Sequence, residues 1–572
     1  MAEFKDDITK ALEKALGGKA KKEEIGSLLE EPSNPEMGDY AFPCFKLAGR
    51  LNKAPQQIAE QLASEIKLPT TVARLKAAGP YLNFFVKKEE LAGKAISEIL
   101  KKKDSYGKSK TGNGKKVMVE YSAPNTNKPL HVGHVRNNCI GMAVSNLLEA
   151  TGHKVIKANL VNDRGVHICK SMLAYKKWGK GKKPSKNRKS DHFVGDFYVQ
   201  FNKQLKEDPS LEQEALLMLR KWENQDKEVI ALWKKMNKWA IDGFKQTYKD
   251  FGVKFDIWLK ESEFYNKAKP ILEDGTEKGV FFEDDEGKLV AKLEHHDLPN
   301  KVVLRSDGSS IYITNDLALT KHKFEKFKLD QSIWVVASEQ NLYFQQLFKI
   351  FELLGFKWFS GCRHLSYGMV FLPEGKMKSR EGTVVDADDL LKKMADLSAK
   401  EITKRYPTLS AKEKEKRAKA IALAAIKFYM LRVDESRDLQ FNPKESLSFE
   451  GETGPYLQYT YARAKSILRK SKKKSGKIDF SLLESETEKK VAKLLYAFPE
   501  SVEKAGLSLR PHIVSQHLVE LASAFNSFYH SSRVLNAENE RLVKARLALV
   551  EATAQVLKNG LGLLSIEAIE KM

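Results

Sequence analysis

A strand–helix–strand pattern between residues 116 and 161 constrains the fold of this chain more than any other feature. The apolar run 116–121 predicts a buried strand, residues 135–150 carry apolar side chains along one side of a helix, and 154–161 predicts a second strand. A similar pattern follows at 332–371. Strands joined by crossover helices run parallel, and ligands bind where such strands end. The sequence therefore predicts an α/β fold with a Rossmann-type parallel sheet and a binding site at one edge.

The remaining sequence predicts further domains around this sheet. The sequence up to about residue 110 mixes helical, turn-rich and β-rich segments, which predicts a small α+β domain. A long, mostly helical stretch rich in tryptophan separates the two sheet patterns, and strand patterns end near residue 386. We therefore expect an N-terminal α+β domain at 1–110, a catalytic domain at 111–385 with an insertion at about 172–300, a helical connector at 386–450 and an α-helical domain at 451–572.

The charge balance indicates the kind of partner. The chain has 98 Lys and Arg against 75 Asp and Glu, so its net charge is 98 − 75 = +23. Its 42% apolar and 30% charged residues are typical of folded domains and exclude disorder over most of the chain. Such a surplus of positive charge favours a polyanionic partner, and nucleic acid is the first candidate. A basic surface without such a partner would explain the same charge. Basic runs at 176–189 and 469–477 are either RNA contacts or solvated loops.

The N-terminus and the cysteines suggest a compartment. Phe4, Ile8, Leu12 and Leu16 form the apolar face of an amphipathic helix, which is unlike a signal peptide. No run approaches the ~18 apolar residues of a membrane helix. The four cysteines form no CxxC pair, which argues against a disulfide framework or a cysteine-built zinc site. We expect a soluble protein of the cytoplasm.

The sharpest short motif is His131-Val132-Gly133-His134, between a predicted strand and a predicted helix. The first turn of a helix offers unpaired N–H groups and a positive dipole to phosphate. Gly133 lets a nucleotide approach the backbone closely, and two imidazoles can donate hydrogen bonds to phosphate oxygens. The motif predicts a nucleotide site, with a pair of capping or packed histidines as the alternative.

A second candidate is the loop Gly375-Lys376-Met377-Lys378-Ser379-Arg380-Glu381-Gly382. It follows the last predicted strand of the second pattern, and three cations lie within five residues. Such a loop suits the binding of a triphosphate, although a basic surface loop has the same composition.

Two carboxylates and a phenol are expected to share the sheet edge. The run 310–314, which contains Tyr312, predicts a strand, and a helix is expected to begin at Asp316. Glu120 ends the first strand. Carboxylates pair with a planar guanidinium through two parallel hydrogen bonds. These residues suit the recognition of a guanidinium group, although Asp316 would also suit the first turn of a helix.

The stretch EYSAPNTNKPLHVGHVRNN resembles the signature of class I aminoacyl-tRNA synthetases, and specifically of the arginyl-tRNA synthetases. Similarity to this family continues along the chain. NPEMGDYAF and GPYLNFF resemble its N-terminal domain, and NDRGVH, YITNDLA and ASEQN resemble its catalytic core. FEGETGPYLQYTYARAKSI and LASAFNSFYHSSRVL resemble its helical anticodon-binding domain.

The resemblance implies a reaction. L-Arginine and ATP with Mg²⁺ would form arginyl-adenylate and pyrophosphate, and the arginyl group would pass to the terminal adenosine of tRNA(Arg). Activation would need bound tRNA, as in this family. Positioning and charge stabilisation would carry the catalysis, without a protein nucleophile. We expect no resident metal site, no membrane partner and a monomer.

The resemblance also implies roles for residues. The catalytic group would comprise His131, His134, Lys128, Lys376, Lys378 and Arg380. The residues around arginine would be Glu120, Ala123, Pro124, Asn125, His134, Tyr312, Asp316 and Gln340, with Asn125 and Gln340 at the α-amino group. The residues around ATP would be His131, Gly133, His134, Lys376, Met377, Lys378 and Ser379.

The tRNA contacts implied by the resemblance lie in both outer domains. Tyr81 and Asn83 match a surface that reads the D-loop, and 451–467 matches a region near the anticodon. The candidates there are Tyr456, Gln458, Tyr459, Tyr461 and Arg463. Aromatic and cationic side chains suit unpaired bases, although packing between helices would also explain some of these tyrosines.

One motif departs from the family pattern. The second signature of class I enzymes is KMSKS, but this chain has KMKSR, with Ser379 at the fourth position. Family members that lack this lysine usually carry another shortly before the first signature, and Lys128 lies there. The alternatives to an arginine enzyme are a small nucleotidyltransferase, a class I synthetase of another specificity and a non-catalytic RNA-binding paralogue.

Overall fold

A five-stranded parallel sheet forms the centre of the molecule. The computed structural model describes the chain except residues 1, 31, 33, 35–36, 372–384 and 472–477. The sheet has the order β11-β10-β4-β5-β6, with all neighbours parallel. Its strands are β4 (Lys116–Glu120), β5 (Lys154–Val161), β6 (Ile257–Lys260), β10 (Gln331–Ala337) and β11 (Cys362–Tyr367). The two strand–helix–strand patterns of the sequence therefore meet side by side in one sheet, as predicted.

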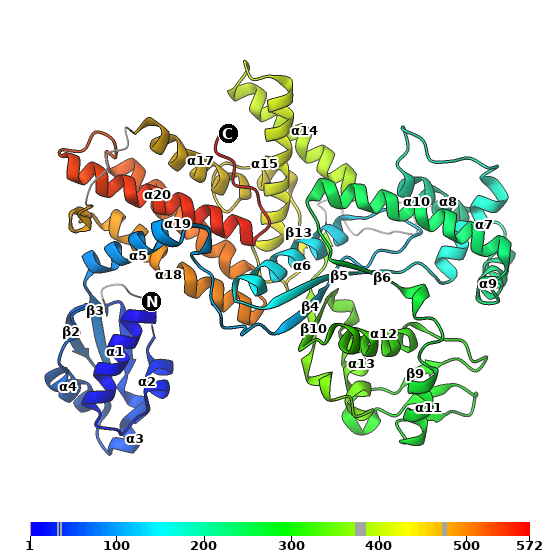
Figure 1. Ribbon diagram of the computed structural model, residues 1–572, viewed down its shortest axis with the longest axis horizontal. Coiled ribbons are helices and arrows are strands. Elements are labelled where there is room, and N and C mark those ends of the chain that lie inside the picture. Colours follow the sequence, from blue (N-terminus) through cyan, green and yellow to red (C-terminus); the bar gives the residue numbers. More distant parts are fainter. Residues whose placement is uncertain (1, 31, 33, 35–36, 372–384, 472–477) are drawn as a thin grey trace.

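Helix α6 (Val132–Ala150) follows β4 and is almost entirely buried. It lies between the sheet and the C-terminal helices (Figure 1). Asn137 fixes it to the sheet, because its amide donates to the Val335 carbonyl at 2.7 Å and its carbonyl accepts from the Ser122 N–H at 2.5 Å. At the other end, the Asn146 amide donates to the carbonyls of Gly562 and Leu563, both at 3.2 Å.

Two predictions about the middle of the chain are wrong. The expected insertion at about 172–300 contains β6, which is the edge strand of the central sheet. The expected strand near Tyr312 is instead the first turn of α12 (Tyr312–Phe327). Alternating β-branched residues favour a strand there, but the Thr314 hydroxyl accepts from the Ile311 N–H at 3.1 Å and begins the helix.

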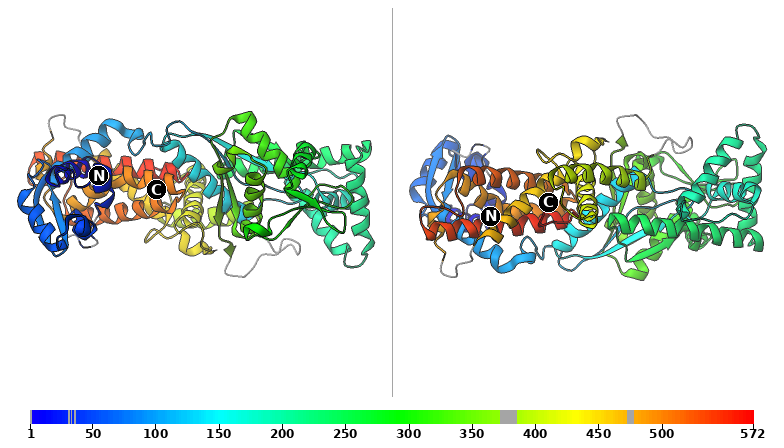
Figure 2. Two further views of the ribbon diagram at one scale, coloured as in Figure 1. Left: turned by 90° about the horizontal axis from the view of Figure 1, so that it is seen from below. Right: turned by 90° about the horizontal axis from the view of Figure 1, so that it is seen from above.

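The insertion has a core of its own at one end of the molecule (Figures 1 and 2). Its helices are α7 (Val166–Trp178), α8 (Ser190–Gln204), α9 (Ser210–Glu223) and α10 (Lys227–Phe251). A second small unit packs below the sheet and contains α11 (Lys269–Glu277), β7 (Phe281–Glu283), β8 (Leu289–Ala291), β9 (Lys301–Leu304), α12 and α13 (Asn341–Leu353).

The N-terminal domain lies at the opposite end (Figure 2). Its antiparallel sheet has the order β1-β3-β2, with β1 (Tyr40–Pro43), β2 (Val72–Ala78) and β3 (Tyr81–Val86). Its helices are α1 (Ala2–Ala15), α2 (Lys22–Leu28), α3 (Ala48–Leu51) and α4 (Pro55–Glu65). The following helix α5 (Lys88–Lys102) packs against the C-terminal helices, where the Tyr106 hydroxyl donates to the Leu495 carbonyl at 2.9 Å.

Helices dominate the chain after residue 386. They are α14 (Ala387–Arg405), α15 (Ala411–Leu431), α16 (Pro443–Ser446), α17 (Gly454–Lys470), α18 (Glu486–Ser508), α19 (His512–Ser531) and α20 (Glu540–Leu563). In the described part of this stretch, one short strand interrupts them: β13 (Leu439–Gln440) pairs with β12 (Val370–Phe371). Among the described residues, no helix has the length and apolar character needed to cross a bilayer.

Arg136 joins α6 to this pair of short strands. Its guanidinium is fully buried and donates to four carbonyls. Nη1 contacts those of Gly368 at 2.7 Å and Met369 at 3.1 Å, and Nη2 contacts those of Glu435 at 3.1 Å and Arg437 at 2.7 Å. Backbone carbonyls that leave regular structure near a core need such a donor, because an unpaired one costs about 1–3 kcal/mol.

We predict that Arg136→Met lowers the free energy of unfolding by about 3–5 kcal/mol, because the buried carbonyls lose their donor. Arg510→Met is the matched control, because half-exposed Arg510 pairs with Glu435 from the surface and should contribute less than about 1 kcal/mol. Chemical denaturation followed by circular dichroism measures both. Equal midpoints for the two variants would contradict the role of Arg136.

Candidate active site

The candidate site lies where the strands of the central sheet end. Glu120, Val161, Lys260 and Ala337 are the last residues of β4, β5, β6 and β10, and parallel strands place them at one edge. Strand order reverses between β4 and β10, since β5 and β6 continue on one side of β4 and β10 and β11 on the other. Such a reversal opens a crevice between the loops that follow the two strands.

His131 and His134 cap α6 at this crevice. His131 has extended backbone, and its Nδ1 accepts from the Gly133 N–H at 3.2 Å. His134 Nδ1 accepts in turn from the His131 N–H at 3.1 Å, and the two ring centres are 4.0 Å apart. The capping alternative raised by the sequence is therefore part of the geometry. It uses only one nitrogen of each ring.

The capping bonds fix the protonation of both rings. Because each Nδ1 accepts a hydrogen bond, the neutral ring carries its proton on Nε2. Burial, and then the charge of Lys128, lowers the pKa of His131 to about 3. Burial and the neighbouring His131 and Lys128 hold the pKa of His134 well below its ordinary value. Both imidazoles are thus neutral donors through Nε2, which suits oxygens that gain negative charge.

Lys128 lies in the loop before these histidines and is mostly buried. Burial lowers the pKa of its ammonium. Its side chain has no acid partner within 4 Å in the described part of the chain. A cation that is buried beside two neutral imidazoles lacks the compensation that buried charges normally have, so an anionic ligand would stabilise it.

The loop after β4 is strained. Ser122 and Ala123 have φ of 79° and 47°, a left-handed conformation that costs non-glycine residues about 1–3 kcal/mol. The Pro124 carbonyl accepts from the Asn162 N–H at 3.0 Å, which holds Asn125 beside the end of β5. Across the crevice, exposed Gln340 precedes α13. The structure therefore brings Ala123, Pro124, Asn125 and Gln340 to the same edge.

Asp316 lies in the first turns of α12 with a phenol beside it. The donor to its carboxylate is the Tyr343 hydroxyl, and the expected partner Tyr312 is instead 58% exposed at the start of the helix. Burial raises the pKa of Asp316 to about 6, against the effects of Tyr343 and Lys323. Glu120 is also buried, but it is already paired with the fully buried ammonium of Lys323. The guanidinium role expected for Glu120 is therefore partly satisfied within the fold.

Glu261 is a site residue that the sequence analysis missed. It follows β6 directly and is buried, and the Asn315 amide donates to its Oε1 at 3.1 Å. Its Oε2 is buried without a hydrogen-bond partner among the described residues. Burial raises its pKa to about 7, although the charge of Arg164 lowers it, and the charge of Asp316 raises it further. The signal was present in the sequence, since a carboxylate ends the short apolar strand IWLK.

The second signature falls on Lys376, Met377, Lys378, Ser379 and Arg380, which lie outside the described residues. The residues that follow are described and run beside the first signature. The Val132 N–H donates to the Val385 carbonyl at 3.1 Å, and the Ala387 N–H donates to the Leu130 carbonyl at 2.9 Å.

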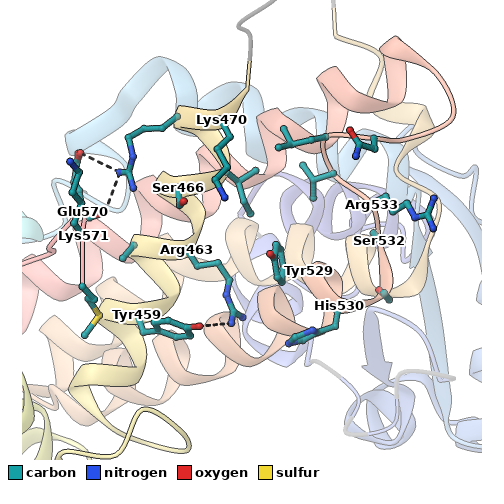
Figure 3. A pocket seen from close by; sticks show the side chains of 18 of the residues that line it. Tyr459, Arg463, Ser466, Lys470, Tyr529, His530, Ser532, Arg533, Glu570 and Lys571 are labelled. Carbon is teal, nitrogen blue, oxygen red and sulfur yellow. Dashed lines mark hydrogen bonds and ion pairs between the residues drawn. The ribbon is translucent and has the colours of Figure 1, made fainter. Parts of the chain in front are cut away.

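A basic groove of about 990 Å³ lies far from the sheet, between α17, the end of α19 and the C-terminal segment (Figure 3). Arg463 donates to the Tyr459 hydroxyl at 2.9 Å and lies over the ring of Tyr529, which is 39% exposed. The cationic side chains of the lining are Arg417, Arg463, Arg469, Lys470, Arg533 and Lys571, against the one carboxylate side chain of Glu570. Cations beside partly exposed aromatic rings suit unpaired bases and their phosphates.

Several expected RNA contacts are instead packed inside the protein. Tyr461 is 5% exposed, and Gln458 is fully buried with its amide donating to the Glu567 carbonyl at 2.7 Å. Tyr456 is half-buried and accepts from Asn526 at 3.0 Å. A helix with one buried face puts only some of its polar residues at the surface, so Tyr459 and Arg463 remain at the groove.

The N-terminal candidates divide in the same way. Asn83 is only 2% exposed within β3, which leaves its side chain no surface for RNA. Tyr81 is half-buried and contacts Phe45 edge-on, with ring centres 5.7 Å apart. Phe45 is 42% exposed and was missed by the sequence analysis.

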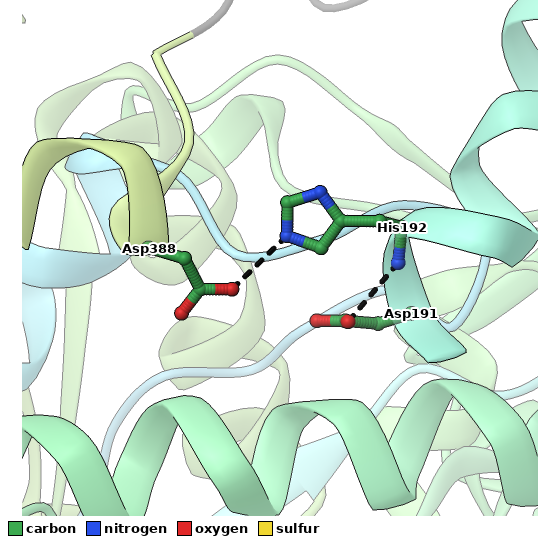
Figure 4. A group of neighbouring side chains, drawn as sticks. All are labelled: Asp191, His192 and Asp388. Atoms are coloured by element: carbon green, nitrogen blue, oxygen red, sulfur yellow. Dashed lines mark hydrogen bonds and ion pairs between the residues drawn. The ribbon is translucent and has the colours of Figure 1, made fainter. Parts of the chain in front are cut away.

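Two clusters of possible metal ligands occur among the described residues, and a basic side chain pairs with carboxylates in each of them. The first consists of Asp191, His192 and Asp388 (Figure 4). The Lys189 ammonium lies 2.7 Å from Asp388 and 3.2 Å from Asp191. The second, of Asp434, Glu435 and His512, pairs with Arg510. Cations of the protein thus already pair with carboxylates of each cluster.

Known protein families match the chain in three consecutive parts. A family described as "Arginyl tRNA synthetase N terminal domain" matches residues 2–86. The family "tRNA synthetases class I (R), catalytic domain" matches residues 95–442, and the "DALR anticodon binding domain" matches residues 457–572. These matches account for most of the described structure.

Individual proteins match over nearly the whole length. The arginine–tRNA ligase of Treponema denticola is 46% identical over 557 residues, which cover 95% of this chain and 94% of the relative. That of Borreliella afzelii is 41% identical over 570 residues, covering 98% and 97%. The structure of Thermus thermophilus arginyl-tRNA synthetase superposes with a TM-score of 0.80 at 27% identity and covers 99% of both chains.

The capping geometry predicts how His131 titrates. With its pKa near 3, the ring should stay neutral and protonated at Nε2 from pH 8 down to about pH 4. An unfolded imidazole takes up a proton near pH 6.5, so the stability contributed by this neutral ring should fall as the pH drops below that value. Ring ¹⁵N shifts of histidine-labelled protein, assigned with His131→Gln, measure this. A midpoint near 6.5 would contradict the buried cap.

Proposed function

The chain belongs to the arginyl-tRNA synthetase family, and we propose how its residues divide the work of that reaction. The enzyme activates L-arginine with ATP and transfers the arginyl group to tRNA. The site residues, the role of Mg²⁺ and the requirement for tRNA during activation are our proposals. The observation that carries them is the convergence of neutral histidines, an unpaired lysine and buried carboxylates at one sheet edge.

Arginine is recognised by charge. We assign the guanidinium to Asp316 and the buried Glu261, which lie close enough for the charge of Asp316 to raise the pKa of Glu261. Glu120 completes the wall of the pocket with its charge balanced by Lys323. Asn125 and Gln340, at the facing ends of β4 and β10, hold the α-amino group, which points the carboxylate toward the nucleotide.

ATP lies against the start of α6. The Nε2–H groups of His131 and His134 donate to the phosphate oxygens, and Lys128 supplies a cation near the α-phosphate. Attack of the arginine carboxylate on that phosphorus forms the mixed anhydride and expels pyrophosphate, so these donors act where negative charge grows. Mg²⁺ enters with ATP as part of this substrate.

The tRNA spans the molecule from the groove at α17 to the crevice. The anticodon loop binds the groove around Tyr459 and Arg463, and bound tRNA completes the arrangement needed for activation. We propose that the enzyme works as a monomer in the cytoplasm. Its four cysteines are buried and free, which suits a reducing compartment.

Arginine specificity should depend on the charge of Asp316. Asp316→Asn keeps the shape of the side chain and removes the charge, so kcat/KM for arginine should fall by about 10²–10³-fold. Asp274→Asn, in an exposed ion pair of α11, is the control and should change little. Steady-state aminoacylation measures both variants. An unchanged arginine KM and kcat for Asp316→Asn would show that this carboxylate does not bind the guanidinium.

Activation should require tRNA and the ammonium of Lys128. Arginine-dependent pyrophosphate exchange should appear only when tRNA is added. With tRNA present, Lys128→Ala should lower kcat by about 10²-fold with little change in arginine KM, because a cation at the transferring phosphate is lost.

Lys378→Ala is the matched comparison in that assay and should cost less. If Lys128→Ala keeps normal turnover and Lys378→Ala is inactive, the cation that contacts the phosphate comes from the second signature and not from Lys128. Exchange without tRNA would reject the tRNA requirement alone.

The exposed loop between α7 and α8 should contribute to tRNA binding. Lys180, Lys182, Lys183 and Lys186 have no acid partner among the residues that the structure describes. Each phosphate contact adds about 0.7–0.9 to the slope of log affinity against log salt concentration. Changing the four lysines to Gln should therefore lower the slope for tRNA binding by about one or more.

A control with the same loss of charge separates contact from net charge. Lys269, Lys278, Lys321 and Lys349 each pair with an acid three or four residues away in the chain. If their replacement by Gln changes the slope as much, the loop makes no specific contact with tRNA.

A further inference from the structure

Charged side chains from the insertion meet the start of α14 in a cluster beside the active site (Figure 4). His192 stands between two carboxylates, with Nε2 3.0 Å from Asp388 and Nδ1 3.4 Å from Asp386. Burial opposes a charged ring there. The hydrogen bond to Asp388 and the surrounding carboxylates outweigh it and raise the pKa of His192.

Lys189 is the centre of this cluster. Its ammonium donates to Asp388 at 2.7 Å, to Asp191 at 3.2 Å and to the Thr247 hydroxyl of α10. Asp191 is fully buried, and it packs so closely on α10 that a Cβ at Gly243 would lie 2.4 Å from its carboxylate. The ammonium thus connects α8, through Asp191, and α10, through Thr247, to the start of α14.

The start of α14 is in turn bonded to the first signature. Backbone hydrogen bonds join Val132 to Val385 at 3.1 Å and Ala387 to Leu130 at 2.9 Å, with His131 and Asp386 paired between them. The backbone of His131 therefore pairs with that of Asp386, and the segment 385–388 continues from this pair into the charged cluster.

Side-chain packing makes the same connection. A cavity of about 10 Å³ is lined by Thr247 of the insertion, Ala387 of α14, and Leu130 and His134 of the signature. These residues have no room to shift independently, because the space between them holds at most about one water molecule.

Asp386 behaves as part of the cluster and not as an ordinary helix cap. It occupies the N-cap position of α14, where an Asp usually accepts from the first backbone N–H groups. Its side chain makes no such bond and turns to His192 instead. The Asp386 carboxylate therefore contacts His192 of the insertion in place of the N–H groups that it would cap.

We propose that Lys189 is a positioning residue for His131. Its ammonium holds the start of α14 against the insertion. The segment 385–387, which leads into α14, is bonded to the backbone of 130–132 and so fixes the direction of the His131 imidazole. Lys189 does not touch the substrates in this arrangement. The inference rests on the proposed role of His131 in the activation step. A displacement of about 1 Å at a group that acts in the transition state is enough to cost about 10²-fold in rate.

The test is a double-mutant cycle on kcat for arginylation at saturating arginine, ATP and tRNA. Lys189→Met should lower kcat by about 10- to 100-fold, with arginine KM unchanged within about twofold. In the His131→Ala background the same change should cost less than about twofold, because the side chain it positions is gone. A purely structural role would instead multiply the two losses.

Lys419→Met is the matched control. Lys419 pairs with Asp250 at 2.5 Å and so also joins α10 to the C-terminal helices, but it does not contact 385–388. It should leave kcat within about twofold in both backgrounds. Thr247→Val removes one acceptor of the ammonium without leaving a buried charge, so it decides the question if Lys189→Met does not fold. It should show a smaller loss that also vanishes with His131→Ala.

The outcomes separate this inference from the proposed function. A folded Lys189→Met enzyme with normal kcat, or losses that multiply in the cycle, would overturn the positioning role alone. An unchanged kcat for His131→Ala would overturn the catalytic role of His131 and this inference with it.

Discussion

The burial of α6 is the constraint on which the rest of the structure depends. Most residues of this helix are buried, so most of the polar groups that it carries must find partners inside the protein. Arg136 does so by donating to four carbonyls of the segments that hold β12 and β13, and Asn137 by bridging β4 and β10. These bonds fix the helix axially and rotationally, so its first turn reaches the crevice with two histidines already oriented.

Much of the architecture could be predicted from the sequence because it follows from local patterns. The apolar runs of β4, β5, β10 and β11 appear where expected, and the crossover rule made them one parallel sheet. The histidine signature was equally accessible, since strand, loop and helix are contiguous in the chain. The long helices after residue 386 also follow their apolar periodicity.

What the sequence could not give depends on contacts between distant segments. Tyr343 replaces Tyr312 beside Asp316, and Lys323 neutralises Glu120, because α12 begins earlier than its β-branched residues suggest. Glu261 reaches the edge of the sheet only because β6 joins the sheet from within the supposed insertion. Packing likewise decides which tyrosine of α17 faces the groove. Tyrosines occur at both half-buried and buried positions of 456–463, so residue type alone does not distinguish them.

The two ends of α6 contact different parts of the molecule. Its first turn carries the histidines, while Asn146 and Thr151 near the other end contact the carbonyl of Gly562 and the backbone of α18 at Gly506. Its 19 residues form a rod of about 28 Å at 1.5 Å per residue. Geometrically this rod is a lever arm: a tilt of about 2° imposed by the helical domain moves the histidine end by about 1 Å. The helical C-terminal domain therefore has a mechanical route to the two histidines that requires no loop to carry the signal.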